Sequence, residues 1–188
     1  MNLKKLVFSS TLLVSTLFAG TYNVDTSHSN VGFKVKHMMI SNVVGKFDTF
    51  SGTFEYDEKN NTLTSLTAQI DVVSVNTENK KRDGHLQASD MFDVKKYPKI
   101  DFVVTKIDGE DIYGDFTLKG ITKNIKLELE NGGTIKDPWG NFRAAFTLTG
   151  KIKRSDYGLT YNSVLEAGGV AVGDVVKLNI EIEGIKAK

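Results

Sequence analysis

Apolar and polar residues alternate strictly along most of this chain, and no other feature constrains its fold as strongly. In the first such run, Val31, Phe33 and Val35 are separated by Gly32 and Lys34. Successive side chains of a β-strand point to opposite faces, so each run predicts a strand with one buried and one wet face. The other apolar positions in register are Phe54, Tyr56, Leu66, Ala68, Ile70, Val72, Ile100, Phe102, Val104, Ile112, Phe116, Leu118, Ile125, Leu127, Leu129, Ala144, Phe146, Leu148, Ile152, Val176, Leu178, Ile180 and Ile182.

Turn-forming residues separate the alternating runs. Glycine, asparagine, aspartate or proline occur at 58–61, 108–109, 131–133 and 137–140. Such short connections indicate hairpins, and therefore an antiparallel sheet with solvent on one side. A closed barrel and a two-layer sandwich satisfy this pattern equally well.

Two segments depart from the alternation. Residues 76–89 favour a short helix, for which Asn76 or Thr77 can serve as the N-cap. Leu86 is the only strong apolar residue in that segment, so nothing local explains why the helix should form. A second irregular stretch, at residues 38–40, interrupts the strand order.

The N-terminus has the pattern of a secretory signal peptide. Lys4 and Lys5 precede an apolar stretch over residues 6–18, which ends at the small residues Ala19 and Gly20. The stretch is shorter than the roughly 20 apolar residues that a spanning helix needs, so the protein is not expected to span a membrane. We expect cleavage after Ala19 or Gly20.

Residues 21–188 then form a single domain of ordinary size. Removing Lys4 and Lys5 with the leader leaves 22 basic residues against 23 acidic ones, which argues against nucleic acid as a partner. The chain has no cysteine, so no disulfide, thiolate metal site or acylated cysteine is available. A bacterial periplasm is the expected compartment, with secretion beyond it left open.

Groups suited to catalysis are scarce. The chain has three histidines, and the strand parity of His28 and His37 is poor for a shared metal. Arg82, Asp83 and His85 could form a charge relay, but Asp83 is more simply a cap or ion-pair partner. We therefore expect no catalytic residues, no metal and no cofactor.

Aromatic bulk, by contrast, is abundant on the apolar face, at Phe33, Phe54, Phe102, Phe116 and Phe146. An eight-stranded barrel is just wide enough to be filled by side chains or to hold one small ligand. The residues alone leave both outcomes open.

An ordered set of motifs resembles the YceI family of exported bacterial proteins, also described as polyisoprenoid-binding and lipocalin-like. The matching residues extend through the whole mature chain. They are Asp25, His28, Ser29, Val31, Phe33, Val35, His37, Gly45, Phe47, Phe50, Gly52, Asn76, Thr77, Arg82, Asp83, His85, Leu86, Met91, Phe92, Asp93, Tyr97, Pro98, Gly114, Phe116, Leu118, Gly120, Thr122, Asp137, Trp139, Gly140, Arg154, Asp156 and Gly158.

The resemblance implies an all-β fold: an eight-stranded antiparallel barrel like that of a lipocalin, with one short helix near an end and an elongated apolar cavity. It also implies binding of isoprenoid, quinone-like or fatty-amide lipids, and it leaves a homodimer open. Met91 and Phe92 stand where members often carry two aromatic residues, which would alter the contour of the cavity.

On this basis we predict that sixteen side chains line the interior. His37, Arg82 and His85 flank the two irregular segments and are predicted to offer hydrogen-bond donors to a polar head group. The sixteen are Val31, Phe33, Val35, Phe54, Ile70, Val72, Phe102, Val104, Phe116, Leu118, Leu127, Leu129, Phe146, Leu148, Leu178 and Ile180.

The expected function is non-catalytic binding, storage or transport of a long apolar lipid. One alternative is a hydrolase-type enzyme acting on a lipid or small molecule through Arg82, Asp83 and His85. Another is an envelope stress protein with a filled core that binds a protein partner.

Overall fold

The computed structural model describes residues 19–166 and 168–188, and the signal peptide prediction falls mainly outside them. Ala19 and Gly20 already lie in the first strand, β1 (Ala19–Val24), where they pair with Asp57 and Tyr56. Cleavage after either residue would leave the pairings of Thr21 and the rest of β1 intact.

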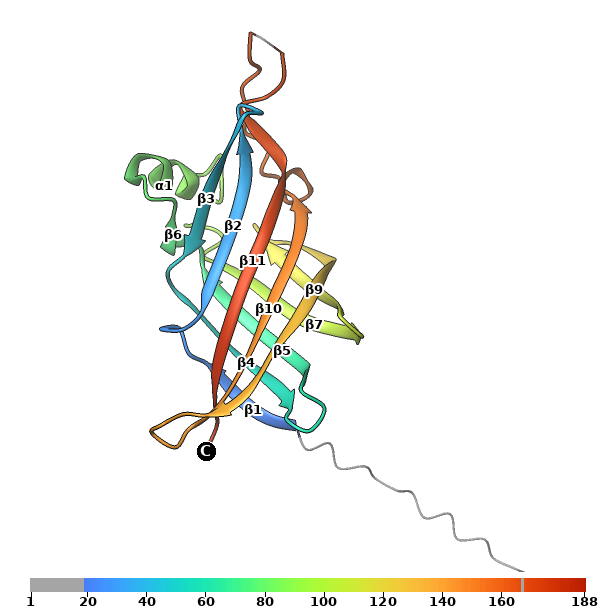
Figure 1. Ribbon diagram of the computed structural model, residues 1–188. Helices are drawn as coiled ribbons and strands as arrows, with labels where there is room; N and C mark the ends of the chain where they lie inside the picture. Colours follow the sequence, from blue (N-terminus) through green and yellow to red (C-terminus); the bar gives the residue numbers. More distant parts are fainter. Residues whose placement is uncertain (1–18, 167) are drawn as a thin grey trace, which may run out of the picture.

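Eight antiparallel strands close into a barrel, as predicted (Figure 1). β1 pairs with both β4 and β11, and this double pairing closes the sheet and excludes the open sandwich. The strands are, in order around the barrel, β1, β4 (Phe50–Asp57), β5 (Thr62–Asp71), β7 (Lys99–Asp108), β8 (Asp111–Leu118), β9 (Ile121–Lys136), β10 (Phe142–Lys153) and β11 (Val172–Lys186).

A second group of strands extends the sheet beside β11. β2 (Asn30–His37) pairs with the N-terminal part of β11, whereas β1 pairs with its C-terminal end. β3 (Ser41–Phe47) follows β2, and the two-residue β6 (Val75–Asn76) follows β3. Long β11 therefore has two successive neighbours along one edge, with residues 25–29 as the break between them.

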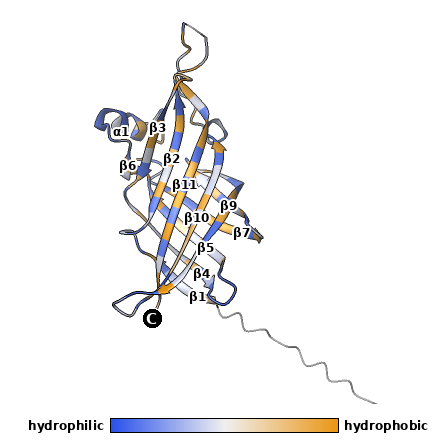
Figure 2. Ribbon diagram, viewed as in Figure 1, coloured by the Kyte–Doolittle hydropathy of each residue, from blue (hydrophilic) through white to orange (hydrophobic). Residues whose placement is uncertain are grey.

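The alternation of apolar residues matches the burial that the barrel produces. Phe54, Ile112 and Leu127 are at most 1% exposed, and their polar neighbours face solvent. Figure 2 shows the alternation as orange and blue bands along the strands. Each such side chain contributes about 1.5–3 kcal/mol by leaving water, so this pattern stabilises one register strongly.

A short helix is present within the predicted segment, as α1 (Lys80–Gln87), but the predicted cap was wrong. The N-cap is Asn79, whose side chain accepts a hydrogen bond from Arg82 N at 3.0 Å. Asn76 is instead part of β6, and Thr77 is buried with its hydroxyl 2.5 Å from an Asp83 carboxylate oxygen. Because Asn76 and Thr77 are held by these other contacts, the helix begins later than predicted.

The two ends of the barrel differ. One end, which we call the mouth, carries α1, the β2–β3 turn and residues 158–166 and 168–171 (Figure 1). The other, which we call the closed end, carries the β9–β10 turn and the C-terminus. Among the described residues, no helix has the length and apolar character to cross a membrane.

Candidate functional site

Two apolar cavities lie in the barrel interior. The larger, about 120 Å³, lies toward the mouth, and the smaller, about 40 Å³, lies toward the closed end. Phe116 on β8 and Leu178 on β11 belong to the walls of both cavities. These two side chains therefore form a partition between the two spaces.

Most of the sixteen predicted lining residues border these cavities. The larger is bordered by Phe33, Val35, Phe116, Leu118 and Leu178. The smaller is bordered by Val31, Ile70, Phe102, Phe116, Leu127, Leu148, Leu178 and Ile180. The other five, Phe54, Val72, Val104, Leu129 and Phe146, border neither.

Phe54 and Phe146 instead belong to an aromatic cluster toward the closed end. The Phe54 ring stacks on Tyr22 at 5.2 Å and meets Phe146 edge-to-face at 5.0 Å. Gly184 lies under Phe54, where a Cβ would come within 2.4 Å of the ring. Because offset and edge-to-face pairs are the favourable geometries for aromatic rings, this end of the interior is filled with side chains.

At the mouth, α1 and the segment after it cover the larger cavity. Leu86, Met91 and Phe92 border this cavity, and Phe92 packs against Phe47 at 6.2 Å between ring centroids. Leu86 thus supplies the reason for the helix that its local sequence lacked: it packs into the barrel opening. None of these three is among the sixteen predicted lining residues, because they follow no strand periodicity, although the family resemblance had linked Met91 and Phe92 to the contour of the cavity.

The three predicted head-group residues lie at the mouth, but none borders a cavity. Arg82 donates from Nε and Nη2 to the hydroxyl and carbonyl of Thr77, both at 2.7 Å. His85 contacts Asp90 at 3.2 Å and packs edge-to-face on Tyr161 at 4.7 Å. His37 ends β2, opposite Val172.

Arg154 is a mouth residue that belongs to the family motifs of the sequence but had no predicted role there. It borders the larger cavity and is 7% exposed. Its guanidinium donates to the carbonyls of Leu159, Tyr161, Val172 and Gly173 at 2.5–3.3 Å, and burial lowers its pKa. The Arg154 guanidinium thus connects residues 159–161 to the start of β11 through hydrogen bonds beside the cavity.

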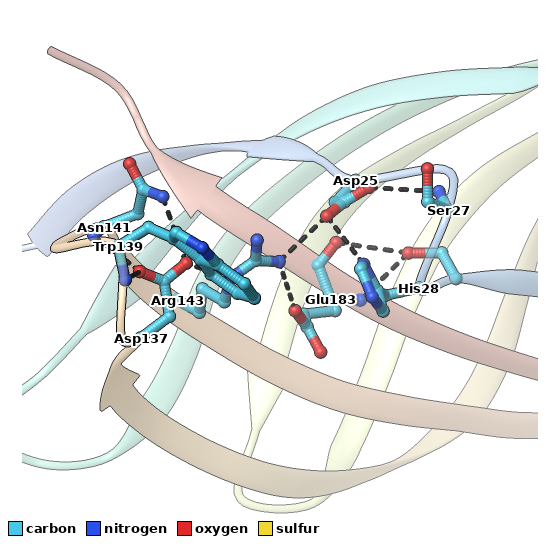
Figure 3. A network of polar contacts seen from close by, with 9 residues as sticks. Asp25, Ser27, His28, Asp137, Trp139, Asn141, Arg143 and Glu183 are labelled. Atoms are coloured by element: carbon cyan, nitrogen blue, oxygen red, sulfur yellow. Dashed lines mark hydrogen bonds and ion pairs between the residues drawn. The ribbon is translucent and has the colours of Figure 1, made fainter.

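A separate polar network joins strands at the closed end (Figure 3). Arg143 on β10 pairs with Asp25 and Asp137, each at 2.8 Å, and also with Glu183. The hydrogen bond from Arg143, with one from His28, lowers the pKa of Asp25 to about 2. The network links the β1–β2 break to β10, β11 and the β9–β10 turn.

Potential metal ligands also occur in this network, at Asp25, His28 and Glu183, with ligand atoms within 4.8 Å of one another. The Arg143 guanidinium bonds to both of the carboxylates. Since a fixed cation already neutralises these carboxylates, they are poorly suited to a second one.

The residues of the alternative charge relay are not connected as a relay requires. Asp83 accepts hydrogen bonds from the amide and hydroxyl of Thr77, at 2.9 and 2.5 Å. His85 contacts Asp90 instead. Asp83 therefore orders the turn before α1 and does not orient His85, as the predicted relay requires.

Comparisons with known proteins agree with this architecture. Residues 22–184 match the model of the YceI-like domain family. A UPF0312 protein of Staphylococcus aureus is 37% identical over 163 residues, which cover 86% of this chain and 95% of that protein. A UPF0312 protein of Pectobacterium atrosepticum is 36% identical over 197 residues, which cover 99% and 100%.

Solved structures share the fold. The YceI protein of Campylobacter jejuni is 40% identical with a TM-score of 0.69, over 87% of this chain and 96% of that one. A polyisoprenoid-binding domain of Saccharophagus degradans is 18% identical with a TM-score of 0.66, over 88% and 98%. The chain belongs to the YceI-like family.

Proposed function

We propose that this protein holds a long apolar lipid, of the isoprenoid, quinone-like or fatty-amide class, inside its barrel and does not alter it chemically. The observation that carries the proposal is the pair of aligned cavities, whose exposed walls are entirely apolar. The Saccharophagus degradans domain of the same fold, which binds polyisoprenoid, supports the same ligand class. The proposed setting is the periplasm, where the protein acts as a carrier or store.

The size of the cavities sets a condition on this binding. An engineered apolar cavity of about 150 Å³ stays dry and binds benzene, so the larger space, at about 120 Å³, suits a group of roughly that size. A longer chain must extend into the smaller cavity. It can do so only if Phe116 or Leu178 moves aside, because these side chains separate the two spaces.

Affinity in this proposal comes from the apolar chain. Each methylene removed from water contributes about 0.8 kcal/mol before the cost of association. The polar head would remain at the mouth, where His37, Arg82 and His85 are the proposed contacts. Arg82 already donates to Thr77, and His85, whose side chain is 41% exposed, contacts Asp90.

Binding is favoured over catalysis by the separation of Asp83 from His85 described above. A hydrolase would need a base oriented beside a nucleophile at the site. The larger cavity, by contrast, is bordered by apolar side chains and Arg154, whose guanidinium donates to backbone carbonyls.

The test is extraction of natively purified, detergent-free protein with organic solvent, followed by mass spectrometry. We expect a co-purifying lipid in the wild type and its loss in Leu178→Trp, which fills the partition. Val103→Trp is the matched control, because Val103 faces outward on β7 and is 43% exposed. Circular dichroism establishes that both variants fold. Wild-type protein that carries no lipid and takes up none from vesicles would refute the proposal.

A further inference from the structure

Three lysines lie side by side across three neighbouring strands. Lys177 on β11 is directly opposite Lys151 on β10 and also directly opposite Lys34 on β2. All three side chains are exposed on the outer face of the barrel. Like charges directly opposite one another destabilise a sheet, so the fold keeps this row at a cost in stability.

The row belongs to a larger basic face. Lys36 and Lys153, also exposed, lie two residues nearer the mouth than Lys34 and Lys151. Among residues 19–166 and 168–188, none of these five lysines forms an ion pair. Because the chain as a whole is almost balanced in charge, the basic face reflects the placement of charge on the barrel.

The strands that carry this face lead to an apolar turn. Met38, Met39 and Ile40 join β2 to β3, and their side chains are 45%, 57% and 86% exposed. Met38 and Met39 have φ angles of 47° and 64°, in the left-handed region where asparagine and glycine are the usual hairpin residues. Neither local conformation nor burial accounts for two methionines here, and a strained position of this kind points to function.

A neighbouring loop adds further apolar surface at the same end. Met38 N donates to Ala171 O at 2.8 Å, which joins the turn to the loop of residues 161–166 and 168–171. In that loop Val164 is 85% exposed and Tyr161 is 44% exposed. Figure 1 shows the turn at the tip of β2 and β3, with the loop rising beyond it at the mouth. Val172, the first residue after the loop, borders the larger cavity.

We propose that the mouth end docks on an anionic lipid bilayer, with residues 38–40 and Val164 entering the interface and the lysine face lying against the head groups. The proposal rests on the proposed lipid-binding function and names the partner from which the lipid would be taken or to which it would be delivered. The charge of the lysine face is complementary to acidic phospholipids. The lysine face is continuous with the apolar turn. This arrangement suits a bilayer, in which charged head groups lie directly above an apolar interior.

The dimensions agree with this orientation. At about 3.3 Å per strand residue, Lys36 lies about 7 Å from Met38, and the row of Lys34 lies about 13 Å away. The head-group region of each leaflet is about 5–8 Å thick, and charges interact over about 8–10 Å at physiological salt. Lys36 and Lys153 therefore reach head-group depth, and the Lys34 row lies just outside it, when the turn is inserted.

The test is flotation of the purified protein with vesicles of phosphatidylcholine alone or of phosphatidylcholine with phosphatidylglycerol. We expect binding to the anionic vesicles that falls with added salt. Met39→Ser with Ile40→Ser should reduce it at least tenfold. Lys34→Gln with Lys177→Gln should reduce it by up to about twenty-five-fold, at roughly fivefold per surface lysine.

Matched controls come from the closed end. Ile135 and Trp139 are 68% and 81% exposed there, and Lys59 and Lys136 offer the same change in charge. The variants Ile135→Ser with Trp139→Ser and Lys59→Gln with Lys136→Gln should bind vesicles as the wild type does. Loss of binding in these controls, with full binding by the mouth variants, would overturn the proposal.

Fluorescence gives an independent reading, because Trp139 is the only tryptophan. Its emission should be unchanged by vesicles, whereas Ile40→Trp in a Trp139→Phe background should shift to the blue. Lipid retention is measured on the same variants by mass spectrometry. Retained lipid without vesicle binding refutes the docking proposal alone, and vesicle binding without any retained lipid refutes the proposed function alone. Binding that needs no anionic lipid, or dimerisation that buries the turn, also overturns docking.

Discussion

Replacement of Phe116 by alanine should join the two cavities into one. Phe116 is 8% exposed and meets the buried Tyr157 edge-to-face at 5.4 Å. A core Phe→Ala change costs about 3–5 kcal/mol, and loss of the aromatic pair is part of that cost. Because cavities of about 120 and 40 Å³ already flank the ring, little can collapse into the space, so we expect a loss of about 4–5 kcal/mol.

The same change should lengthen the chain that the protein can bind. Each extra methylene buried contributes about 0.8 kcal/mol, so two should raise affinity about fifteenfold. The assay is binding of a homologous series of straight-chain alcohols, with urea unfolding to measure stability. Affinity should rise with alcohol chain length up to a limit, and this chain-length limit should be longer for Phe116→Ala than for the wild type.

Phe146→Ala is the control, since Phe146 is also buried, at 2% exposed, but borders neither cavity. It should lose similar stability and keep the wild-type chain-length limit. If Phe116→Ala does not fold, Phe116→Leu provides a milder change, costing about 1–3 kcal/mol. An unchanged limit in a folded Phe116 variant would show that Phe116 does not divide the interior.

Three further predictions concern stability. Gly45→Ala places a Cβ 2.4 Å from the ring of Phe33 and should cost about 1–3 kcal/mol in urea unfolding; if adding Phe33→Leu recovers none of the loss, the clash is not its cause. Tyr157→Phe should raise stability by about 1 kcal/mol, because the buried hydroxyl has no hydrogen-bond partner among the described residues; a lower melting temperature would contradict this. Asp25 has its pKa lowered from 3.8 to about 2, mainly by Arg143, so its contribution is present above pH 3.8 and is lost as the pH falls towards 2. Acid titration of the melting temperature should show that loss in the wild type and a flatter profile in Arg143→Met.

The strands were predictable because burial on one face imposes a period of two on the sequence. The apolar parity from Val31 to Ile182 is the parity that the barrel buries or partly buries. Barrel and sandwich were not separable on that basis, since each buries one face of every strand. Closure depends on the pairing of β1 with the far end of β11, a contact between the two ends of the chain.

The candidate site was predictable only in part. Strand parity led to residues such as Phe116 and Leu178, but parity does not separate a cavity wall from the packed cluster of Phe54 and Phe146. Leu86 was visible as an isolated apolar residue, and its role emerges only from contact with distant strands. Arg154 follows Ile152 on the apolar parity of β10, but parity does not reveal how a buried guanidinium is satisfied, because its acceptors are carbonyls of the loop that follows and of β11.

The amino-acid sequence by itself determined which side chains face inward, because alternation is a local property and burial of the apolar face stabilises only one register. It also determined, through the YceI-like motifs, the barrel that those strands build. Only the tertiary structure decided where the interior is empty, because a void depends on how side chains from different strands meet. It also decided that three lysines lie in one row and lead to the apolar turn, since strands distant in sequence meet there.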